Sequence, residues 1–367
     1  MRILQIMRAP VGGLFRHVAD LSGELAARGH EVGIVADSLV EDGATQARFA
    51  TLLPHCALGI HRLPMPRLLG AADLVTPGRI AGLANRLGVT ILHGHGAKGG
   101  FYARLARRQG QLVFYTPHGG VLHFAPGSVA GRSFKQIERA LMGRTSAIIF
   151  ESRFAQEAFA RQIGTPSCAH SVVHNGLQPA EFMPVPLRPD AAQFCYVGEL
   201  RELKGIFVLV SAFAALAEEH GPTLRLAMAG DGPDRGRLEA EIGRLGLGDQ
   251  ITLLGVKPVR EVLAQGQCLV VPSLAESLPY VVLEAGAAGH QMLATAVGGI
   301  AEIFGPTADR LVPAGDAPAL THAMAQMLVD PDLQAREARR VHIEEGFTVS
   351  AMTEAVTALY RGQSVQA

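Results

Sequence analysis

The sequence predicts an α/β protein with two doubly wound domains, each built on a parallel sheet. Its 367 residues, 48% of them hydrophobic, exceed what one hydrophobic core usually serves. Short apolar runs alternate with longer amphipathic stretches, a pattern typical of parallel sheets covered by helices on both faces. The stretch EFMPVPLRPDAAQ then places three prolines close together. Neither a helix nor a strand continues easily through them, so we place the domain boundary near residues 184–192.

The elements follow in order along the chain. In the first domain, residues 1–186, the predicted strands are RILQIM, EVGIVAD, TILHGH, LVFYTPH, SAIIFES and HSVVHN, with helices at 14–28 and 134–142 among those between them. In the second domain, residues 187–347, they are FCYVGEL, TLRLAMAG, ITLLG, CLVVPS, QMLATA and DRLVPA. We expect residues 348–367 to form a helix that packs back on the first domain. Two such domains bind a ligand at the carboxyl ends of their strands, and we expect that ligand in a cleft between them.

Composition excludes several functional classes. Lys+Arg and Asp+Glu both number 33, which argues against a nucleic-acid binder. The four cysteines form no CxxC pair and predict reduced thiols in a cytoplasmic protein. No run of 18 apolar residues occurs, and the opening apolar stretch is too short for a signal peptide, so we expect neither a membrane span nor a leader.

Polar and glycine-rich segments follow most of the predicted strands. They are RAPVGG, HGHGAKGG, TPHGG, HNG, GELRELKG, AGDGP and SLAESLP. Any one of them could be an ordinary tight turn, which glycine forms at little cost. So many at the same edge of the two sheets indicate a ligand site.

The segment AESLPYVVLEAGAAG holds two carboxylates in apolar surroundings, Glu276 and Glu284. We expect a helix from about Leu278 to Ala288, capped by Ser277. Eight residues of helix separate the two by ~12 Å, too far for an acid–base pair but suited to the two ends of an elongated ligand. Amides of Ser277 and Leu278 would meet an anion. A nucleotide sugar fits, with its ribose on Glu284 and its sugar on Glu276. The spacing is equally compatible with a structural role for both residues, in which Glu276 caps the helix and Glu284 pairs with a neighbouring arginine.

Several segments together resemble retaining glycosyltransferase family 4, which has the GT-B fold. ESLPYVVLEA with AVGGIAEIF is similar to that family's E-x7-E region. In the same order as in the family come VGGLFRHVADLSGELAARGHEV, VVHNGL, YVGELRELKG, AGDGPDRGRLE and LVPAGDAPALTHAM. The resemblance covers nearly the whole chain, and the order of the motifs makes it specific.

The resemblance implies roles for individual residues. His118 matches the family's histidine beside the donor sugar, and Lys204 with a nearby arginine would neutralise the leaving diphosphate. Gly12, Gly13 and Gly198 would lie at the donor, and Arg16, His93, His95 and Lys98 are candidates on the acceptor side. The family's loop arginine is absent, because Glu199 stands at its position. Either Arg201 replaces it, or Lys204 and the helix N-terminus hold the diphosphate alone.

We expect no required metal and no cofactor. His93 and His95 have no nearby cysteine or carboxylate to complete a ligand set, and Asp330-Pro331-Asp332 lies between helical stretches, where aspartate is an ordinary cap. GDGPDRG has its third glycine one place late for a dinucleotide site, and GAKGG lacks the Ser or Thr of a phosphate-binding loop.

The acceptor leaves one clue. From Leu74 to Gln136 the chain has no Asp or Glu but has eight cations: Arg79, Arg86, Lys98, Arg104, Arg107, Arg108, Arg132 and Lys135. Arg104, Arg107 and Arg108 have the spacing of one helix face. This is either a solvated face or a surface for anionic lipid or a phosphate-bearing acceptor.

The sequence thus predicts a glycosyltransferase that moves a sugar from a nucleotide sugar to a hydroxyl acceptor. With the resemblance, we expect a polyprenyl-diphosphate-linked glycan as acceptor, in surface-polysaccharide assembly, and peripheral contact with the inner membrane. Two alternatives remain open at this stage. One is a nucleotide-sugar epimerase of the same architecture, and the other is a catalytically silent protein that binds sugar nucleotides.

Overall fold

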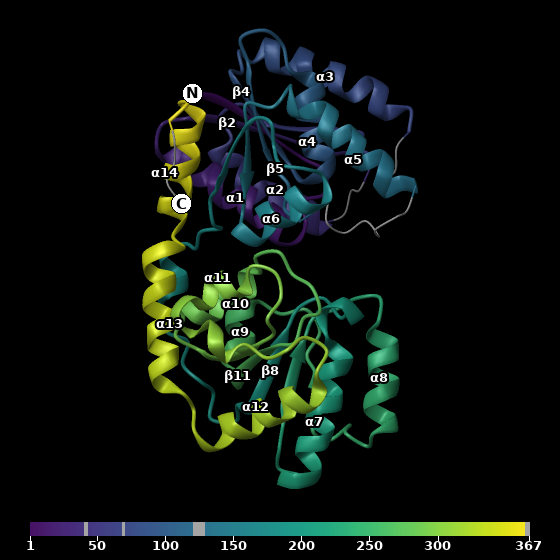
Figure 1. Ribbon diagram of the computed structural model, residues 1–367, viewed down its shortest axis with the longest axis vertical. Helices are drawn as coiled ribbons and strands as arrows, with labels where there is room; N and C mark the ends of the chain where they lie inside the picture. Colours follow the sequence, from purple (N-terminus) through teal and green to yellow (C-terminus); the bar gives the residue numbers. More distant parts are fainter. Residues whose placement is uncertain (40–42, 68–69, 120–128, 364–367) are drawn as a thin grey trace. The chain divides into compact units, whose positions relative to one another are not determined.

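The computed structural model describes residues 1–39, 43–67, 70–119 and 129–363. It divides the chain into two compact units, shown in Figure 1. The N-terminal unit comprises Met1–Gly176 and Val349–Ala367, and the C-terminal unit comprises Leu177–Thr348. Within the described residues, no helix has the length and apolar composition that crossing a bilayer requires.

The N-terminal unit is built on a parallel sheet with the strand order β3-β2-β1-β4-β5-β6-β7. Its strands are β1 (Arg2–Met7), β2 (Glu31–Asp37), β3 (Ile60–Leu63), β4 (Ile91–His95), β5 (Leu112–Thr116), β6 (Ala147–Phe150) and β7 (Ala169–Val172). The strand order reverses between β1 and β4, which is where doubly wound sheets bind ligands. The sequence-based prediction missed the edge strand β3, because its run IHRL is short and half polar.

Helices cover both faces of this sheet (Figure 1). They are α1 (Gly12–Ala27), α2 (Gly43–Leu52), α3 (Ala72–Arg86), α4 (Gly96–Ala106), α5 (Val129–Met142), α6 (Arg153–Gln162) and α14 (Val349–Tyr360), with a 3₁₀ turn, η1 (Leu53–His55). One apolar core lies under α3 and α4, and another joins α1 and α14 to the opposite face. Glycines let α4 approach the sheet closely: a Cβ on Gly99 would lie 2.2 Å from the Ile6 carbonyl oxygen. The GHGAKGG segment is therefore a packing device as well as a turn.

The C-terminal unit has a five-stranded parallel sheet with the order β10-β9-β8-β11-β12. Its strands are β8 (Ala192–Val197), β9 (Leu226–Ala229), β10 (Ile251–Leu253), β11 (Gly266–Val271) and β12 (Gln291–Ala294). The predicted strand DRLVPA was wrong, because within it only Val312 pairs with the sheet, through an isolated bridge to Thr295, and the preceding residues form a 3₁₀ helix.

Helices pack on both faces of this sheet as well, in two apolar cores. They are α7 (Ile206–His220), α8 (Arg235–Arg244), α9 (Val259–Leu263), α10 (Tyr280–Ala287), α11 (Ile300–Phe304), α12 (Ala317–Val329) and α13 (Leu333–Gly346), with 3₁₀ turns η2 (Pro179–Phe182), η3 (Glu202–Lys204) and η4 (Gly305–Arg310). Asp332 caps α13, accepting from the Ala335 amide at 3.0 Å, as predicted for the DPD motif.

The unit boundary differs from the one placed by sequence at residue 186. Leu177 already belongs to the C-terminal unit, where its amide donates to the Phe347 carbonyl oxygen at 2.8 Å. The proline-rich stretch is not a free linker. The Arg188 amide donates to the Ala264 carbonyl oxygen at 2.8 Å, and Arg260 donates to the Met183 carbonyl oxygen at 2.9 Å. The last helix, α14, lies in the N-terminal unit, beside α1.

Candidate functional site

An ion pair between Lys204 and Glu276 forms the centre of the candidate site in the C-terminal unit. Lys204 Nζ donates to both carboxylate oxygens of Glu276, at 2.7 and 2.9 Å. Ser273 Oγ donates to the same carboxylate at 2.7 Å. The Glu276 side chain is 9% exposed and that of Lys204 29%, so the carboxylate is held in place while the ammonium still meets solvent.

Chain segments far apart in sequence meet there because β8 and β11 are neighbours in the sheet. Lys204 ends the turn η3 after β8, and Glu276 lies in the loop after β11. The Leu274 amide donates to the Leu203 carbonyl oxygen at 2.9 Å, joining the two loops. Gly205 has φ +71°, and a Cβ there would lie 1.8 Å from the Pro272 carbonyl oxygen. Only glycine allows this approach, so the contact explains the glycine that follows Lys204.

The GDGPD turn supports the backbone of the GELRELKG loop. A Cβ on Gly230 would lie 1.8 Å from the carbonyl oxygen of Gly198, and the Gly198 amide donates to the Ala229 carbonyl oxygen at 3.0 Å. Asp234 accepts from the Glu202 amide at 2.8 Å. The turn therefore fixes the position of the basic loop and is not a dinucleotide fingerprint.

Glu199 and Arg201 are not arranged as an extended loop would place them. The Arg201 amide donates to the Glu199 carbonyl oxygen at 2.9 Å, so the chain turns between them. Both side chains are exposed, and no ion pair joins them among the described residues. Arg201 is therefore not paired with Glu199, and the two side chains are separated by a turn of the basic loop.

The helix that carries Glu284 begins later than predicted. α10 starts at Tyr280 with Pro279 at its N-cap, and no side chain caps it. Ser277 and Leu278 therefore lie in the loop, and the Ser277 carbonyl oxygen accepts from the Gly299 amide at 2.6 Å. Ser277 is therefore not the N-cap residue of this helix, contrary to the prediction, and Glu276 does not share a helix with Glu284. Glu284 lies inside α10 and is partly exposed.

In the N-terminal unit, Gly12 and Gly13 open α1 directly after the loop that follows β1. Gly12 has φ +62°, a backbone conformation that favours glycine, and it is exposed at the start of the helix. Arg16, one turn along, is paired with Asp20, with Nε 3.5 Å from a carboxylate oxygen. This ion pair restrains the Arg16 side chain, which was a candidate for contact with the acceptor.

His118 follows β5 and lies beside His95, which ends β4. His118 Nε2 is 3.0 Å from His95 Nδ1. The His17 ring, from α1, packs edge-on against the His118 ring with a centroid distance of 4.7 Å. Burial lowers the pKa of His95 and His118 well below the usual range and lowers that of His17 to about 4. At neutral pH these rings are uncharged, and we expect His118 to act as a hydrogen-bonding group and not as a cation.

Two of the acceptor-side candidates have structural partners. His93 is fully buried, with Nδ1 2.6 Å from Tyr360 Oη and Nε2 2.9 Å from Thr116 Oγ1. Lys98 Nζ donates to the Asp73 carboxylate at 2.5 Å. Both contacts leave little capacity for an acceptor, so we interpret His93 as a structural histidine.

The predicted basic helix face does not form. α4 ends at Ala106, and Arg107 has non-helical φ and ψ, so Arg104, Arg107 and Arg108 do not line one face. Arg104 is fully buried and makes a bidentate pair with Glu138, at 2.7 Å on both arms. Its charge is neutralised inside the unit and cannot attract a ligand at the surface.

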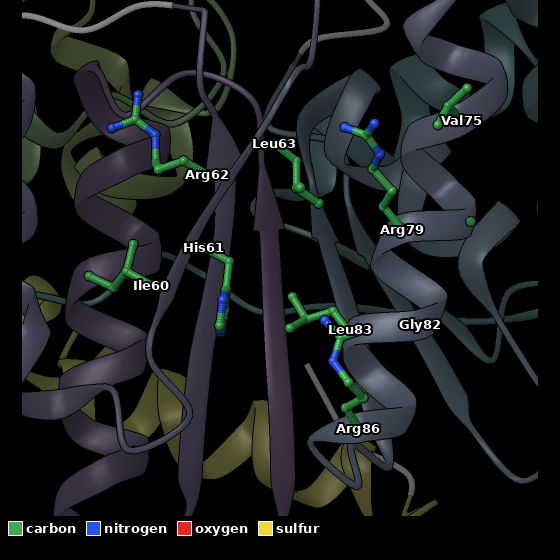
Figure 2. Close-up of a pocket in the computed structure, with 10 residues that line it drawn as sticks. Ile60, His61, Arg62, Leu63, Val75, Arg79, Gly82, Leu83 and Arg86 are labelled. Carbon is green, nitrogen blue, oxygen red and sulfur yellow. The ribbon is translucent and has the colours of Figure 1, made fainter.

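Arg79 and Arg86 instead line a groove of about 770 Å³ between α3 and the edge strand β3. Figure 2 shows Arg62 and His61 on the strand and the two helix arginines opposite them. The described residues that line the groove include no Asp or Glu. Of the cations that the sequence analysis grouped together, Arg79 and Arg86 line this groove. Arg62, from the edge strand, adds a third positive charge there.

Sequence reasoning missed the residues that surround His118. His17 Nδ1 lies 3.0 Å from Asn175 Oδ1, and His95 Nε2 lies 2.7 Å from Gln5 Oε1. A glutamine in the middle of the apolar run RILQIM was a usable signal, because a buried polar side chain requires a partner. Nothing in the local sequence marks His17. The ligand nitrogens of His17, His95 and His118 all lie within 4.8 Å of one another, close enough to hold a metal ion.

Two family models match the chain, one over each half. Residues 11–181 match Glycosyltransferase Family 4, and residues 178–344 match Glycosyl transferases group 1. The chain belongs to the family 4 glycosyltransferases. This glycosyltransferase is 29% identical over 308 residues to a component of human phosphatidylinositol N-acetylglucosaminyltransferase, covering 80% of its own length and 61% of the human protein. The chain thus spans less than two thirds of that relative.

Other relatives and solved structures agree with this assignment. The putative glycosyltransferase EpsD of Bacillus subtilis is 28% identical over 296 residues, which cover 73% of this glycosyltransferase and 76% of EpsD. Sucrose-phosphate synthase from Thermosynechococcus elongatus superposes with a TM-score of 0.80 at 23% identity, covering 99% of both chains. Anabaena HepE, solved with UDP and glucose, gives 0.78 at 18% identity over 99% of this chain and 100% of HepE. At these identities the likeness shows the fold, which is GT-B.

Proposed function

We propose that this family 4 glycosyltransferase moves a hexose-type sugar from a nucleotide-sugar donor to a hydroxyl of a lipid-linked glycan, with retention of anomeric configuration. The observation that carries the proposal is the Lys204–Glu276 pair, in the loops after two adjacent strands. A cation and a carboxylate held together suit a sugar bound to a leaving diphosphate: the ammonium faces the phosphates, and the carboxylate accepts from sugar hydroxyls.

We assign donor binding to the loops of the C-terminal unit that carry Lys204 and Glu276. Lys204 and Arg201 neutralise charge as the diphosphate leaves, Glu276 binds the sugar and Glu284 binds the ribose. In the N-terminal unit, His118 contacts the donor sugar, and the backbone of Gly12 and Gly13 approaches the phosphates. A structural neighbour solved with UDP and glucose supports a nucleotide-sugar donor. A relative named for teichuronic acid biosynthesis, the putative glycosyltransferase TuaC of Bacillus subtilis, supports a glycan acceptor.

Glu284 provides a direct test of the donor site. We expect Glu284→Ala to weaken binding of the free nucleoside diphosphate by ~1.5–3 kcal/mol, the range for a hydrogen bond to a charged group. Calorimetry with UDP, GDP and ADP measures this. A folded variant with unchanged affinity for the diphosphate that the native enzyme prefers would remove Glu284 from the site.

We propose that turnover requires no divalent metal, because the cations of the basic loop neutralise the leaving diphosphate. Activity is then expected to survive dialysis against excess EDTA. If chelation abolishes transfer and magnesium or manganese restores it, the leaving group is neutralised by a metal and this part of the proposal fails.

The acceptor side of the proposal places the enzyme at the inner membrane surface. Arg62, Arg79 and Arg86 line a groove whose described lining has no carboxylate, with Leu63 and Leu83 providing apolar surface (Figure 2). Cationic and apolar groups together suit a phosphate-bearing lipid. Sedimentation with phosphatidylglycerol vesicles, compared with phosphatidylcholine vesicles, tests this. Equal binding to both would contradict an electrostatic contact.

Incubation with radiolabelled nucleotide sugars and a membrane extract separates transfer from the other activities of this architecture. A thermal-shift screen of UDP-, GDP- and ADP-sugars first selects the donor, because a saturating ligand stabilises the folded state. We expect label in a glycan product. Label in an isomerised nucleotide sugar would identify an epimerase, and unchanged donor in every extract would identify a binding protein.

A further inference from the structure

His118 is one of four histidines packed together in the N-terminal unit. The ring centroids of His93 and His95 are 4.1 Å apart, those of His95 and His118 5.3 Å, and those of His17 and His118 4.7 Å. Three of the four, all except His118, are at most 2% exposed. Their neighbours therefore determine both the orientation of the His118 ring and the position of its proton.

With the Gln5 side-chain oxygen as the terminal acceptor, the hydrogen bonds run in one direction, from His118 through His95 to Gln5. Gln5 Oε1, which only accepts, lies 2.7 Å from His95 Nε2, so His95 carries its hydrogen on Nε2. Burial keeps His95 neutral, and its Nδ1 is then a bare lone pair. His118 Nε2, 3.0 Å away, donates to that lone pair. The neutral His118 is left with an unprotonated Nδ1.

The backbone and ring contacts of His118 are also constrained. His118 has φ +49°, the left-handed region, and among the described residues no other non-glycine residue has a positive φ. Such a conformation persists when the surrounding structure over-determines it, and it is common at functional sites. The edge-on contact from His17 adds a second restraint, and Asn175 holds His17 in turn at 3.0 Å.

We propose that His95, oriented by Gln5, is a positioning residue that holds His118 as the Nε2–H tautomer, so that His118 Nδ1 accepts a hydrogen bond from a hydroxyl of the donor sugar. The inference deepens the proposed function and rests on it for the identity of the sugar. It assigns His118 a specific role: an acceptor for a neutral hydroxyl, and neither a cation for the diphosphate nor an acid for the leaving group.

A metal ion is the rival occupant of this cluster. His17 Nε2 is buried without a hydrogen-bond partner among the described residues, and one ring nitrogen from each of His17, His95 and His118 lies within 4.8 Å of the other two. A zinc ion would need all three of these nitrogens as bare lone pairs. The hydrogen that His118 donates to His95 occupies one of them. Metal binding would thus require the opposite tautomer of His118, which makes the two accounts distinguishable.

The decisive experiment is ¹⁵N NMR of the imidazoles in the full-length protein, with His118→Ala used to assign the signals. We expect His118 to show a protonated Nε2 and an unprotonated Nδ1. His95→Leu removes the acceptor and should abolish this preference, whereas His95→Asn keeps an amide oxygen near the position of Nδ1 and should retain it. His93→Asn is the matched control, because His93 is equally buried but bonds to Tyr360 and Thr116. It should leave the His118 signals unchanged.

Kinetics with the donor give the second readout. A lost hydrogen bond of ordinary strength predicts about a tenfold fall in kcat for His95→Leu, with unchanged affinity for the nucleoside diphosphate and substantial recovery in His95→Asn. His118 protonated on Nδ1, an unaltered tautomer in His95→Leu, or tight stoichiometric binding of Co²⁺ with visible absorption bands would each overturn the proposal. The NMR result stands even if no transfer is found, so failure of the proposed function is a separate outcome.

Discussion

At the scale of single residues, the Glu276 carboxylate is held by Lys204, which donates to both of its oxygens, and by Ser273. Lys204 and Glu276 were predicted from separate motifs, and the structure joins their side chains at 2.7 Å. Gln5, His17 and Asn175 were not predicted, because each lies in its own segment and only the fold brings it near His95 or His118. Motifs identify residues whose chemistry shows locally, whereas partners supplied by distant segments require the tertiary structure.

The basic loop carries the sharpest prediction at this scale. Charge grows on the diphosphate as the glycosidic bond breaks, so a cation there stabilises the transition state more than the ground state. Lys204→Ala and Arg201→Ala should each cost ~2–3 kcal/mol of transition-state stabilisation, about 30- to 150-fold in kcat. Glu199→Ala, in the same loop and at an exposed position like Arg201, is the control and should cost far less. Steady-state kinetics with a saturating donor measure all three.

The reverse ranking would change the interpretation of the loop. If Glu199→Ala were crippling and Arg201→Ala mild, Arg201 would not replace the arginine that the family carries at position 199. Glu199 would then have a role of its own in donor binding.

At the scale of elements, most strands and helices were predictable, and the errors lie where a segment is short or its residue types fit more than one structure. The strand β2 was placed to the residue, and β11 was placed two residues late at both ends. β3 was missed because its run IHRL is short and half polar, whereas DRLVPA was wrongly assigned because its apolar run forms only one isolated bridge, at Val312. The start of α10 was misplaced because Ser277 has the residue type of a cap but is held in a loop by Gly299. Local propensity does not decide between these alternatives.

The Arg104–Glu138 pair links α4 to α5 and predicts a large effect on stability. Both side chains are at most 1% exposed, so Glu138→Ala leaves a guanidinium buried without its counter-charge. Breaking such a pair typically costs about 3–5 kcal/mol. We expect the free energy of unfolding of the N-terminal unit, measured by denaturant titration, to fall by that amount. The double variant Arg104→Met/Glu138→Leu should recover most of the loss. Equal stability of the single variant and the wild type would show that the pair contributes nothing.

At the scale of the whole molecule, the division into two units was predicted from length and alternation, but its position was not. The prolines near residues 184–192 suggested a linker, yet they lie on the C-terminal unit, held through Arg188 and Arg260. The return of α14 to the N-terminal unit also affects the site, because Tyr360 bonds His93 beside His95. Contacts between segments so distant in sequence leave no local pattern.

The buried histidines make the stability of the N-terminal unit depend on pH. The pKa of His17 falls from 6.5 to about 4 on folding, and burial also lowers the pKa values of His93, His95 and His118. Between pH 6.5 and 4 the unfolded chain therefore binds protons that the folded unit does not, so stability falls as pH falls. Each such histidine contributes a slope of about 1.4 kcal/mol per pH unit.

Denaturant unfolding at pH 7.5, 6 and 5 measures this dependence. We expect little change from pH 8 to 7 and a progressive loss below pH 6.5, smaller in His17→Asn than in the wild type. A flat profile between pH 7 and 5 would mean that the histidines gain protons equally in the folded and unfolded states, so that burial does not lower their pKa values.

The measurement that tests the central claim most directly is the anomeric configuration of the product made from a nucleotide sugar. With the donor selected by thermal shift and a membrane extract or a lipid-linked glycan as acceptor, we predict a glycoside whose anomeric proton signal shows the configuration of the donor, formed in the presence of EDTA. Lys204→Ala should form the same product more slowly. A product of inverted configuration would contradict retention, and an isomerised nucleotide sugar with no glycoside would contradict the assignment of this enzyme as a transferase.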